Sequence, residues 1–330
     1  MLMMIFAAVA GLVALVGGGE LLVRGAVQLA ERARVTPLIV GLVIVGFGTS
    51  MPELVTSVEA AMRDAPGIAW GNIIGSNIAN SLLILGMAAA ITPIILGQGK
   101  ILRDPLIAVS ASVLLLLLAI SGSGTFLLGL AMLAGLATYI VYCYRQEKRI
   151  ERQAGTDHVA PIDKAIALEL SDPTLHGKRN GWGKPVALTL LGLLILIGGG
   201  HLLVGAAVDI ARLFGLSETL IGLTIVAVGT SLPELVTTII AAWRKQAEVA
   251  FGNVIGSDIY NILGIGGATM LFAPGAIPNE LISRDLPVMV ASAILLLLIC
   301  FFFRRFGRMT GLLLVAGYSI YLGILVAAAI

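Results

Sequence analysis

Charged residues are scarce in this chain of 330 residues, because Lys, Arg, Asp and Glu together make up only 12 % of it. A typical soluble domain has about 25 % charged residues. Hydrophobic residues reach 58 % here, so the chain has too few polar side chains to cover a surface in water. Apolar stretches of about 20 residues, long enough to cross about 30 Å of hydrocarbon, recur along the whole sequence. The composition therefore predicts an integral membrane protein with the lipid bilayer around it.

Other shortages exclude further classes of protein. The net charge is only +2, and no stretch combines a basic stripe with stacking aromatic residues, so we expect no nucleic-acid partner. The two cysteines, Cys143 and Cys300, lack the spacing of a metal site and receive no role. The N-terminus has no basic region before its apolar run to Val23, so a first membrane helix is expected there rather than a cleaved signal peptide. We expect no cofactor, and the sequence does not define an oligomeric state.

An internal duplication spans the chain. Residues 41–61 (GLVIVGFGTSMPELVTSVEAA) align without gaps with residues 222–242 (GLTIVAVGTSLPELVTTIIAA), so Gly41 pairs with Gly222 and the offset stays constant. The same offset aligns GNIIGSNIAN at 71–80 with GNVIGSDIYN at 252–261, and it aligns the glycine triplet 17–19 with the triplet 198–200. The two halves are therefore repeats of one unit.

The apolar stretches predict the fold class: an all-α integral membrane protein with ten transmembrane helices, arranged as two inverted five-helix repeats. The domains are a first repeat at 1–144, a polar loop at 145–184 with much of the clustered charge, and a second repeat at 185–330. The expected helices lie near residues 2–23, 37–62, 69–96, 104–120, 125–144, 185–212, 218–243, 249–272, 285–303 and 309–329.

The distribution of Lys and Arg predicts the orientation. All of the 21 Lys and Arg residues except Arg63, Arg212 and Arg284 fall in the odd-numbered loops. Because cytoplasmic loops are enriched in basic residues, the central loop should be cytoplasmic and both termini outside. Each half has an odd number of spans, so the second repeat should enter the membrane from the opposite side, as in many secondary transporters.

A carboxylate lies in the middle of one predicted span of each repeat, Glu53 in the first and Glu234 in the second. An ionised carboxylate at that depth costs several kcal/mol unless it is paired, hydrated or bound to a cation. A proline, Pro52 or Pro233, directly precedes each glutamate. Because proline has no N–H to donate and clashes with the carbonyl four residues earlier, the helix should bend there and free backbone carbonyl oxygens.

Hydroxyl and amide side chains accompany each glutamate. A Thr-Ser pair comes just before it, and in the next span a serine and an asparagine four residues apart share one helix face. With the carboxylates and the freed carbonyl oxygens, they form a hard, all-oxygen ligand set, which suits Ca²⁺ or Na⁺ better than Zn²⁺ or Cu²⁺. The hydroxyl and amide residues are Thr49, Ser50, Ser76, Asn80, Thr230, Ser231, Ser257 and Asn261.

Single polar residues in a span also have plainer explanations. Proline often makes a packing kink, and Ser or Thr often forms hydrogen bonds between helices. Packing does not require two carboxylates at equivalent positions, however, and this favours a cation site. The role of Asp258 stays open between shaping a pocket, binding a cation and a local hydrogen bond. Glu20 and His201 occupy equivalent positions with different chemistry, and a vestibule or interfacial location explains them equally well.

At these motifs the sequence resembles the calcium/cation antiporter superfamily, which comprises the sodium/calcium exchangers and their prokaryotic relatives and has a pair of α-repeats as its signature. The matching segments are GTSMPEL at 48–54 and GTSLPEL at 229–235, each followed by a GN..GS motif that begins at residue 71 or 252. The resemblance covers the entire predicted ten-helix layout.

The resemblance implies a multi-pass protein of the cell membrane, of the prokaryotic inner-membrane type. It would be a secondary active antiporter that exchanges Ca²⁺ for Na⁺ by alternating access. Glu53 and Glu234 would be the central Ca²⁺ ligands. The eight hydroxyl and amide residues and backbone oxygens near Gly46 and Ala227 would complete overlapping Ca²⁺ and Na⁺ sites. Some members have Asp where Asn261 stands, so potassium dependence does not follow from the resemblance. The glycine-rich first and sixth helices would slide across the rest of the bundle.

Three alternatives stay open at this point. The protein could instead be an antiporter that exchanges Ca²⁺, or another cation, for H⁺. A cation channel would use the same oxygen ligands in a continuous pore without a counter-ion, although inverted repeats with broken helices argue against it. An intramembrane enzyme could use paired acids for hydrolysis, but no nucleophile and base accompany them, so we expect no enzyme.

Overall fold

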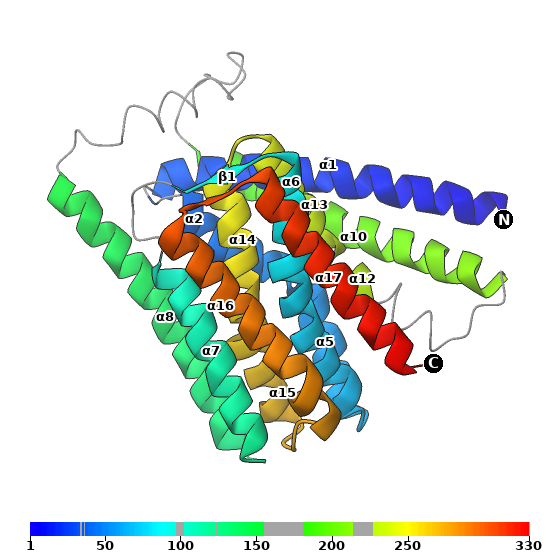
Figure 1. Cartoon of the computed structure of the whole chain (residues 1–330). Coiled ribbons are helices and arrows are strands. Elements are labelled where there is room, and N and C mark those ends of the chain that lie inside the picture. The colour runs from blue at the N-terminus through cyan, green and yellow to red at the C-terminus, as the bar shows by residue number, and fades with distance from the viewer. Residues whose placement is uncertain are drawn as a thin grey trace.

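The computed structural model describes residues 1–33, 35, 37–96, 102–122, 124–154, 181–213 and 227–329. Its elements form a bundle of helices (Figure 1). In chain order they are α1 (Leu2–Ala33), α2 (Pro37–Val40), the π-helix η1 (Gly41–Val45), α3 (Gly46–Thr49), α4 (Met51–Met62), α5 (Pro66–Ile78), η2 (Ala79–Ile84), α6 (Leu85–Ile91), β1 (Ile94–Ile95), α7 (Arg103–Ile120), α8 (Phe126–Ala154), α10 (Gly183–Leu213), α12 (Ala227–Thr230), α13 (Leu232–Trp243), α14 (Ala247–Ile259), η5 (Tyr260–Gly266), α15 (Gly267–Phe272), η6 (Leu281–Asp285), α16 (Leu286–Phe302), β2 (Arg305–Phe306) and α17 (Arg308–Ala329).

The helices have the length and composition of membrane spans. Within the described ranges, eight are long and apolar enough to cross a bilayer, and the bent pair Gly41–Thr49 and Met51–Met62 makes a ninth if counted as one span. The shorter apolar helix α13 covers the end of the span expected at 218–243, and residues 214–226 lie outside the described ones.

Apolar side chains cover the outside of this bundle and polar side chains lie inside it. Phe6 and Leu127 are each 73 % exposed, whereas Glu53 and Glu234 are each 1 % exposed. Because a soluble protein shows the reverse arrangement, this distribution identifies lipid as the surrounding solvent. The prediction of a helical protein that crosses the membrane several times is therefore confirmed.

Two local features differ from the prediction. The helix expected at 125–144 continues as α8 to Ala154, so the beginning of the predicted polar loop is helical; residues 155–180 lie outside the described ones. The all-α prediction also missed a short antiparallel ladder in which β1 pairs with β2, with Ile94 opposite Phe306. Each strand has two residues, too few for any alternating pattern to be recognised in the sequence.

The long helices α1 and α10 lie side by side along one flank of the bundle (Figure 1). Glycines form the seam between them. A Cβ on Gly18 would lie 2.6 Å from the Leu196 backbone nitrogen, and one on Gly192 would lie 2.4 Å from the Leu22 nitrogen. The two backbones therefore touch where only glycine fits, which is how helices approach closely in lipid. Gly18 belongs to the first predicted triplet, whereas its neighbour Gly17 is exposed.

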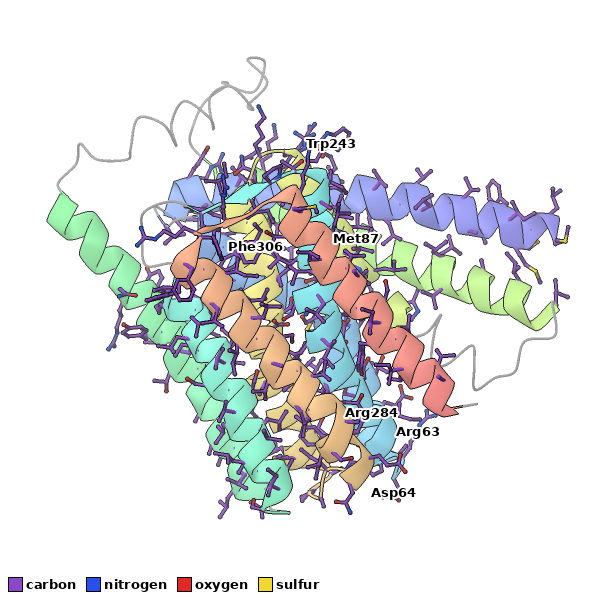
Figure 2. All side chains as sticks on the ribbon, in the orientation of Figure 1. Arg63, Asp64, Met87, Trp243, Arg284 and Phe306 are labelled. Carbon is purple, nitrogen blue, oxygen red and sulfur yellow. The ribbon has the colours of Figure 1, made fainter. Side chains whose placement is uncertain are left out.

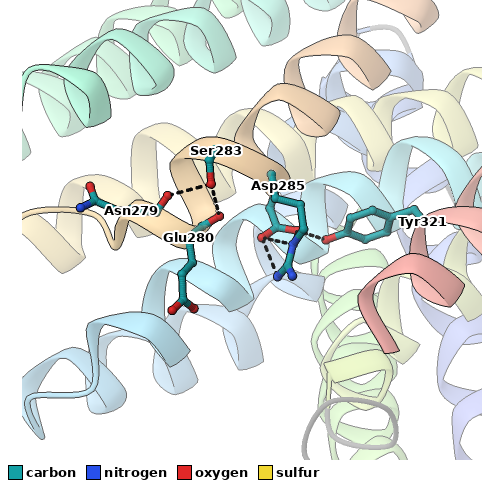
Figure 3. Close-up of polar contacts among 6 residues, drawn as sticks. Asn279, Glu280, Ser283, Asp285 and Tyr321 are labelled. Atoms are coloured by element: carbon teal, nitrogen blue, oxygen red, sulfur yellow. Dashed lines mark hydrogen bonds and ion pairs between the residues drawn. The ribbon is translucent and has the colours of Figure 1, made fainter. Parts of the chain in front are cut away.

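An ionic cluster joins neighbouring helices at an equivalent place in each half. Asp285, at the start of α16, accepts hydrogen bonds from Arg284 and from the Tyr321 hydroxyl of α17 at 2.8 Å (Figure 3). Asp104, at the start of α7, likewise accepts from Arg103 and from the Tyr139 hydroxyl of α8 at 2.7 Å. Each aspartate thus connects its helix to the next one along the chain.

Equivalent helix ends of the two halves lie at opposite ends of the bundle. Arg63 and Asp64 follow α4, and Trp243 ends α13, which is the counterpart of α4 in the aligned repeats. Figure 2 shows Arg63 and Asp64 at the lower end of the bundle and Trp243 at the upper end. The two glutamate-bearing helices therefore run into the bundle from opposite directions.

Candidate cation site

Each glutamate follows a break in its helix. Ser50 (φ −82°, ψ 6°) separates α3 from α4, and Ser231 (φ −89°, ψ 8°) separates α12 from α13. The helix axis bends by 49° at the first break. Pro52 and Pro233 are the second residues of α4 and α13, where the missing N–H has no helical partner to lose. The predicted bend is confirmed in the first repeat, and both breaks place a glutamate in the first turn of a new helix.

π-helical turns carry further predicted ligands. Asn80 lies in η2 and Asn261 in η5, two segments that begin at equivalent positions of the repeats. A third segment, η1, ends directly before Gly46. π-Turns in helices frequently occur at functional sites. Sequence reasoning placed these asparagines in ordinary helices, because the extra residue of a π-turn leaves no compositional signal.

Hydroxyl groups of each repeat donate to the carboxylate of the other. Ser50 Oγ donates to Glu234 Oε1 at 2.9 Å, and Ser231 Oγ donates to Glu53 Oε1 at 3.0 Å. Ser231 Oγ also lies 3.3 Å from Ser76 Oγ. These contacts join residues that are 155 to 184 positions apart in the sequence. The two breaks therefore meet in the middle of the bundle and form one polar cluster.

Each carboxylate keeps one oxygen without a hydrogen-bond partner. Glu53 Oε2 and Glu234 Oε2 are fully buried and, within the described part of the chain, have no donor. Buried acceptor atoms without a partner are rare in proteins and costly. A cation bound between the two carboxylates would satisfy both oxygens.

Two asparagines that sequence reasoning left out brace this cluster. Asn72 Nδ2 donates to the Glu53 carbonyl oxygen at 3.3 Å and to Ser57 Oγ at 2.9 Å, and its Oδ1 accepts from Thr230 Oγ1 at 3.4 Å. Asn72 thus connects the glutamate-bearing helix of its own repeat to the Thr-Ser pair of the other.

The same arrangement recurs in the second repeat. Asn253 Nδ2 donates to the Glu234 carbonyl oxygen at 3.4 Å and to Thr238 Oγ1 at 2.8 Å, and its Oδ1 accepts from Thr49 Oγ1 at 3.2 Å. The signal for Asn72 and Asn253 is the asparagine of the GN..GS motif, from which the predicted site took only the serine.

The remaining predicted residues lie around the same cluster. Ser257 Oγ donates to the Gly46 carbonyl oxygen at 3.4 Å. Asn80 Nδ2 donates to Asp258, and the Oδ1 atoms of Asn80 and Asn261 are buried without a partner among the described residues. Ala227 begins α12, one turn before Ser231. All predicted site residues thus lie on the broken helices or on the π-containing helices beside them.

Polar residues whose roles were left open lie elsewhere or in a second layer. Glu20 of α1 pairs with Arg24 on its own helix and with Arg244 at the end of α13. His201 is exposed on α10. Asp258 is buried beside Asn80 and does not contact either glutamate through a hydrogen bond described in this structure. Glu20 and His201 are therefore outside the central cluster.

The chemistry of the cluster is that of a hard-cation site. Its donors are carboxylate, hydroxyl, amide and backbone carbonyl oxygens, which bind Ca²⁺ and Na⁺. No group of three or more His, Cys, Asp and Glu that could hold a metal ion occurs in the described ranges. Sites for Zn²⁺ and related metals are usually built from such groups.

Comparison with known proteins identifies the family. The sodium/calcium exchanger protein family matches residues 3–145 and 184–327. The putative antiporter CaxA of Alkalimonas amylolytica is 35 % identical over 317 residues, which cover 94 % of this chain and 95 % of that protein. The sodium/calcium exchanger MaX1 of Methanosarcina acetivorans is 32 % identical over 336 residues, which cover 96 % of each.

A solved structure shows the same fold. The sodium-calcium exchanger NCX_Mj superimposes with a TM-score of 0.82 at 28 % sequence identity, over 98 % of each chain. The relatives named here are exchangers and antiporters. The match over both halves, the shared fold and the oxygen-lined cluster lead to one conclusion: this chain belongs to the sodium/calcium exchanger family of membrane cation antiporters.

Proposed function

We propose that this protein exchanges Ca²⁺ for Na⁺ across the membrane at one site that its two repeats share. The observation that carries the proposal is the reciprocal bonding of the two halves. Ser50 donates to Glu234, Ser231 donates to Glu53, and each glutamate keeps one buried oxygen without a partner among the described residues. Two carboxylates have the charge that neutralises one Ca²⁺.

The proposed ligands divide into two groups. Glu53 and Glu234 are the central Ca²⁺ ligands. The surrounding oxygens complete the six to eight that Ca²⁺ typically takes, and some of them form the Na⁺ sites. These are the side chains of Thr49, Ser50, Ser76, Asn80, Thr230, Ser231, Ser257 and Asn261 and the backbone oxygens near Gly46 and Ala227.

Shared oxygens account for coupling. When Ca²⁺ leaves, the two carboxylates repel each other in a medium of low dielectric constant, so several Na⁺ ions or protons must replace it before the site can reorient. Reorientation by alternating access would then expose the site to one side of the membrane at a time. The glycine seam holds α1 and α10 together as a close pair, and this pair would slide as a unit against the rest of the bundle.

We further propose ten spans in two inverted repeats, with both termini outside. The eight apolar spans, the bent pair and α13 account for ten segments. The opposite placement of Arg63 and Trp243 in Figure 2 supports the inversion, and the basic residues of the odd-numbered loops support a cytoplasmic central loop. In Figure 1 both chain ends lie to the right, whereas the end of α8, which leads into the central loop, lies far to the left. This placement supports termini on the side of the membrane opposite to the central loop.

Flux measurements in liposomes test the proposal. Purified protein is reconstituted into vesicles loaded with Na⁺, and uptake of ⁴⁵Ca²⁺ is followed with an outward Na⁺ gradient, without Na⁺, and with a pH gradient. We expect uptake only with the Na⁺ gradient, and loss of uptake in Glu53→Gln and in Glu234→Gln. Uptake driven only by the pH gradient would replace Na⁺ with H⁺ as counter-ion, and uptake without any counter-ion would indicate a channel.

A further inference from the structure

A third buried carboxylate lies beside the proposed site. Asp258 of α14 is 4 % exposed. Its Oδ1 accepts from Asn80 Nδ2 at 3.1 Å, and its Oδ2 accepts from Ser81 Oγ at 3.0 Å. Asn80 and Ser81 belong to η2 of the first repeat, so this contact also connects the two halves. Neither glutamate of the central cluster takes part in it.

The contact determines which end of the Asn80 amide faces away from Asp258. An amide carries two N–H donors on one side and an acceptor oxygen on the other, and its orientation follows from its neighbours. The carboxylate of Asp258 accepts from the Nδ2 end. The opposite orientation would place two acceptor oxygens against each other. Asn80 Oδ1 is thereby left buried and without a hydrogen-bond partner in the described part of the chain.

Asn80 belongs to the helix face that reaches the central cluster. Ser76, four residues earlier on the same helix, lies 3.3 Å from Ser231 Oγ, and Ser231 donates to Glu53. Residues four apart lie next to each other on a helix surface. The Asn80 side chain therefore lies on the same helix face as Ser76, and its buried, unpartnered oxygen has the chemistry of a cation ligand.

The contact of Asp258 with Asn80 and Ser81 has no counterpart at the equivalent positions of the aligned repeats. In the aligned repeats, Asn77 stands where Asp258 stands, and Ile262 stands where Ser81 stands. Asn77 Nδ2 donates to the Ile73 carbonyl oxygen of its own helix at 2.7 Å. The acid on α14 and the hydroxyl that donates to it are thus both replaced at the equivalent positions.

We propose that Asp258 is a positioning residue that holds the Asn80 amide with its oxygen toward the cation site. The proposal rests on the proposed function, because it takes Asn80 as a ligand. Asn80 and Asn261 then contribute unequally, since only Asn80 is held by a carboxylate in the described structure. Without Asp258 the amide can turn, and its N–H groups would then point at the cation and repel it.

The test compares equivalent substitutions in the two repeats. Asp258→Leu removes the acceptor at similar side-chain size, and Asn77→Leu is the matched control. In reconstituted vesicles we expect Asp258→Leu to raise the half-saturating Ca²⁺ concentration about tenfold, as for loss of one ligand interaction to an ion, and to keep most of the maximal rate. We expect Asn77→Leu to leave the half-saturating concentration unchanged. Equal values in the two variants, or a fall in maximal rate alone, would overturn the proposal.

A charge exchange keeps the proposal testable if Asp258→Leu does not fold. Asn80→Asp alone places two carboxylates together and should abolish saturable uptake. In the double variant Asn80→Asp with Asp258→Asn, the amide at 258 donates to the carboxylate at 80, which again turns an oxygen toward the site. This variant should restore saturable uptake. If the double variant were no better than Asn80→Asp, the proposal would fail. Absence of Ca²⁺ transport in the wild type would overturn the proposed function as well, whereas normal wild-type transport with unaltered Asp258 variants overturns this inference alone.

Discussion

At the scale of single residues, buried polar atoms at the site are held by partners from both repeats. Asn72 and Asn253 each hold the carbonyl oxygen of a glutamate in their own repeat and accept from a threonine of the other. Each amide thus adds a donor to a carbonyl oxygen in the first turn of the glutamate-bearing helix. The position of each glutamate therefore depends on an asparagine that is not itself among the proposed ligands.

Removal of such a brace should weaken cation binding. Asn253 is completely buried, and a buried polar group that loses its partner costs about 1–3 kcal/mol. We expect Asn253→Ala to raise the half-saturating Ca²⁺ concentration for uptake about tenfold, since about 1.4 kcal/mol corresponds to a factor of ten. Asn279→Ala, at an exposed position, serves as the control. An unchanged half-saturating concentration in Asn253→Ala would contradict this account of the brace.

The sequence indicated Glu53, Glu234 and the Thr-Ser pairs because ionisable and hydroxyl groups are unusual in an apolar span. It could not indicate that Ser50 serves Glu234 rather than Glu53, because partners across the repeats follow only from how the two halves cross. The roles of Asn72 and Asp258 stayed hidden for the same reason.

At the scale of elements, the seam between α1 and α10 consists of glycines placed where backbones touch. A side chain on Gly18 would meet the Leu196 backbone, whereas one on Gly17 would meet nothing within 4 Å among the described residues. The glycine triplets in the sequence predicted that the first and sixth helices slide across the rest of the bundle, but they did not indicate that α1 packs against α10 through Gly18. The distinction between Gly17 and Gly18 depends on the rotation of α1 about its axis.

Neighbouring substitutions test the seam. Gly18→Val should force the two helices apart and slow Ca²⁺ uptake several-fold, because a Cβ there would lie 2.6 Å from a backbone nitrogen. Binding of ⁴⁵Ca²⁺ to the purified protein should change little, because the cluster lies on other helices. Gly17→Val should leave both uptake and binding unchanged. If Gly18→Val transported at the rate of the wild type, the seam would have no part in the transport cycle.

The ionic clusters at the starts of α7 and α16 are equivalent but unequally buried. Arg103 is 11 % exposed and Arg284 is 42 % exposed. Removing one partner of a buried pair costs about 3–5 kcal/mol, whereas exposed pairs contribute about 0–1 kcal/mol. Asp104→Ala should therefore lower the unfolding midpoint in detergent more than Asp285→Ala. Equal shifts of the unfolding midpoint in the two variants would show that burial of the arginine does not determine how much stability is lost.

At the scale of the whole molecule, the proposed inversion predicts opposite accessibility of equivalent residues. Asp64 and Lys245 follow α4 and α13, and both are exposed. In a background without Cys143 and Cys300, a membrane-impermeant thiol reagent should label Asp64→Cys in intact cells. It should label Lys245→Cys only after the cells are permeabilised. Labelling of both positions from one side would contradict the inverted arrangement.

The helical membrane fold could be predicted from the sequence, because the length of the apolar stretches and the constant offset between the repeats can be read directly along the chain. Three kinds of local feature could not be predicted in this way. They are the π-turns η2 and η5, the extension of α8 to Ala154 and the ladder between Ile94 and Phe306. The ladder shows the reason most plainly, because its two strands come from opposite halves of the chain.

The central claim is that two homologous halves build one cation site. The most direct test is to measure how many Ca²⁺ ions bind to each purified chain, by equilibrium dialysis with ⁴⁵Ca²⁺, with and without Na⁺. The account predicts one Ca²⁺ per chain, displaced by Na⁺, and complete loss of binding in either Glu53→Gln or Glu234→Gln. Two ions per chain, of which each substitution removes only one, would mean that each repeat holds its own site and would contradict the account.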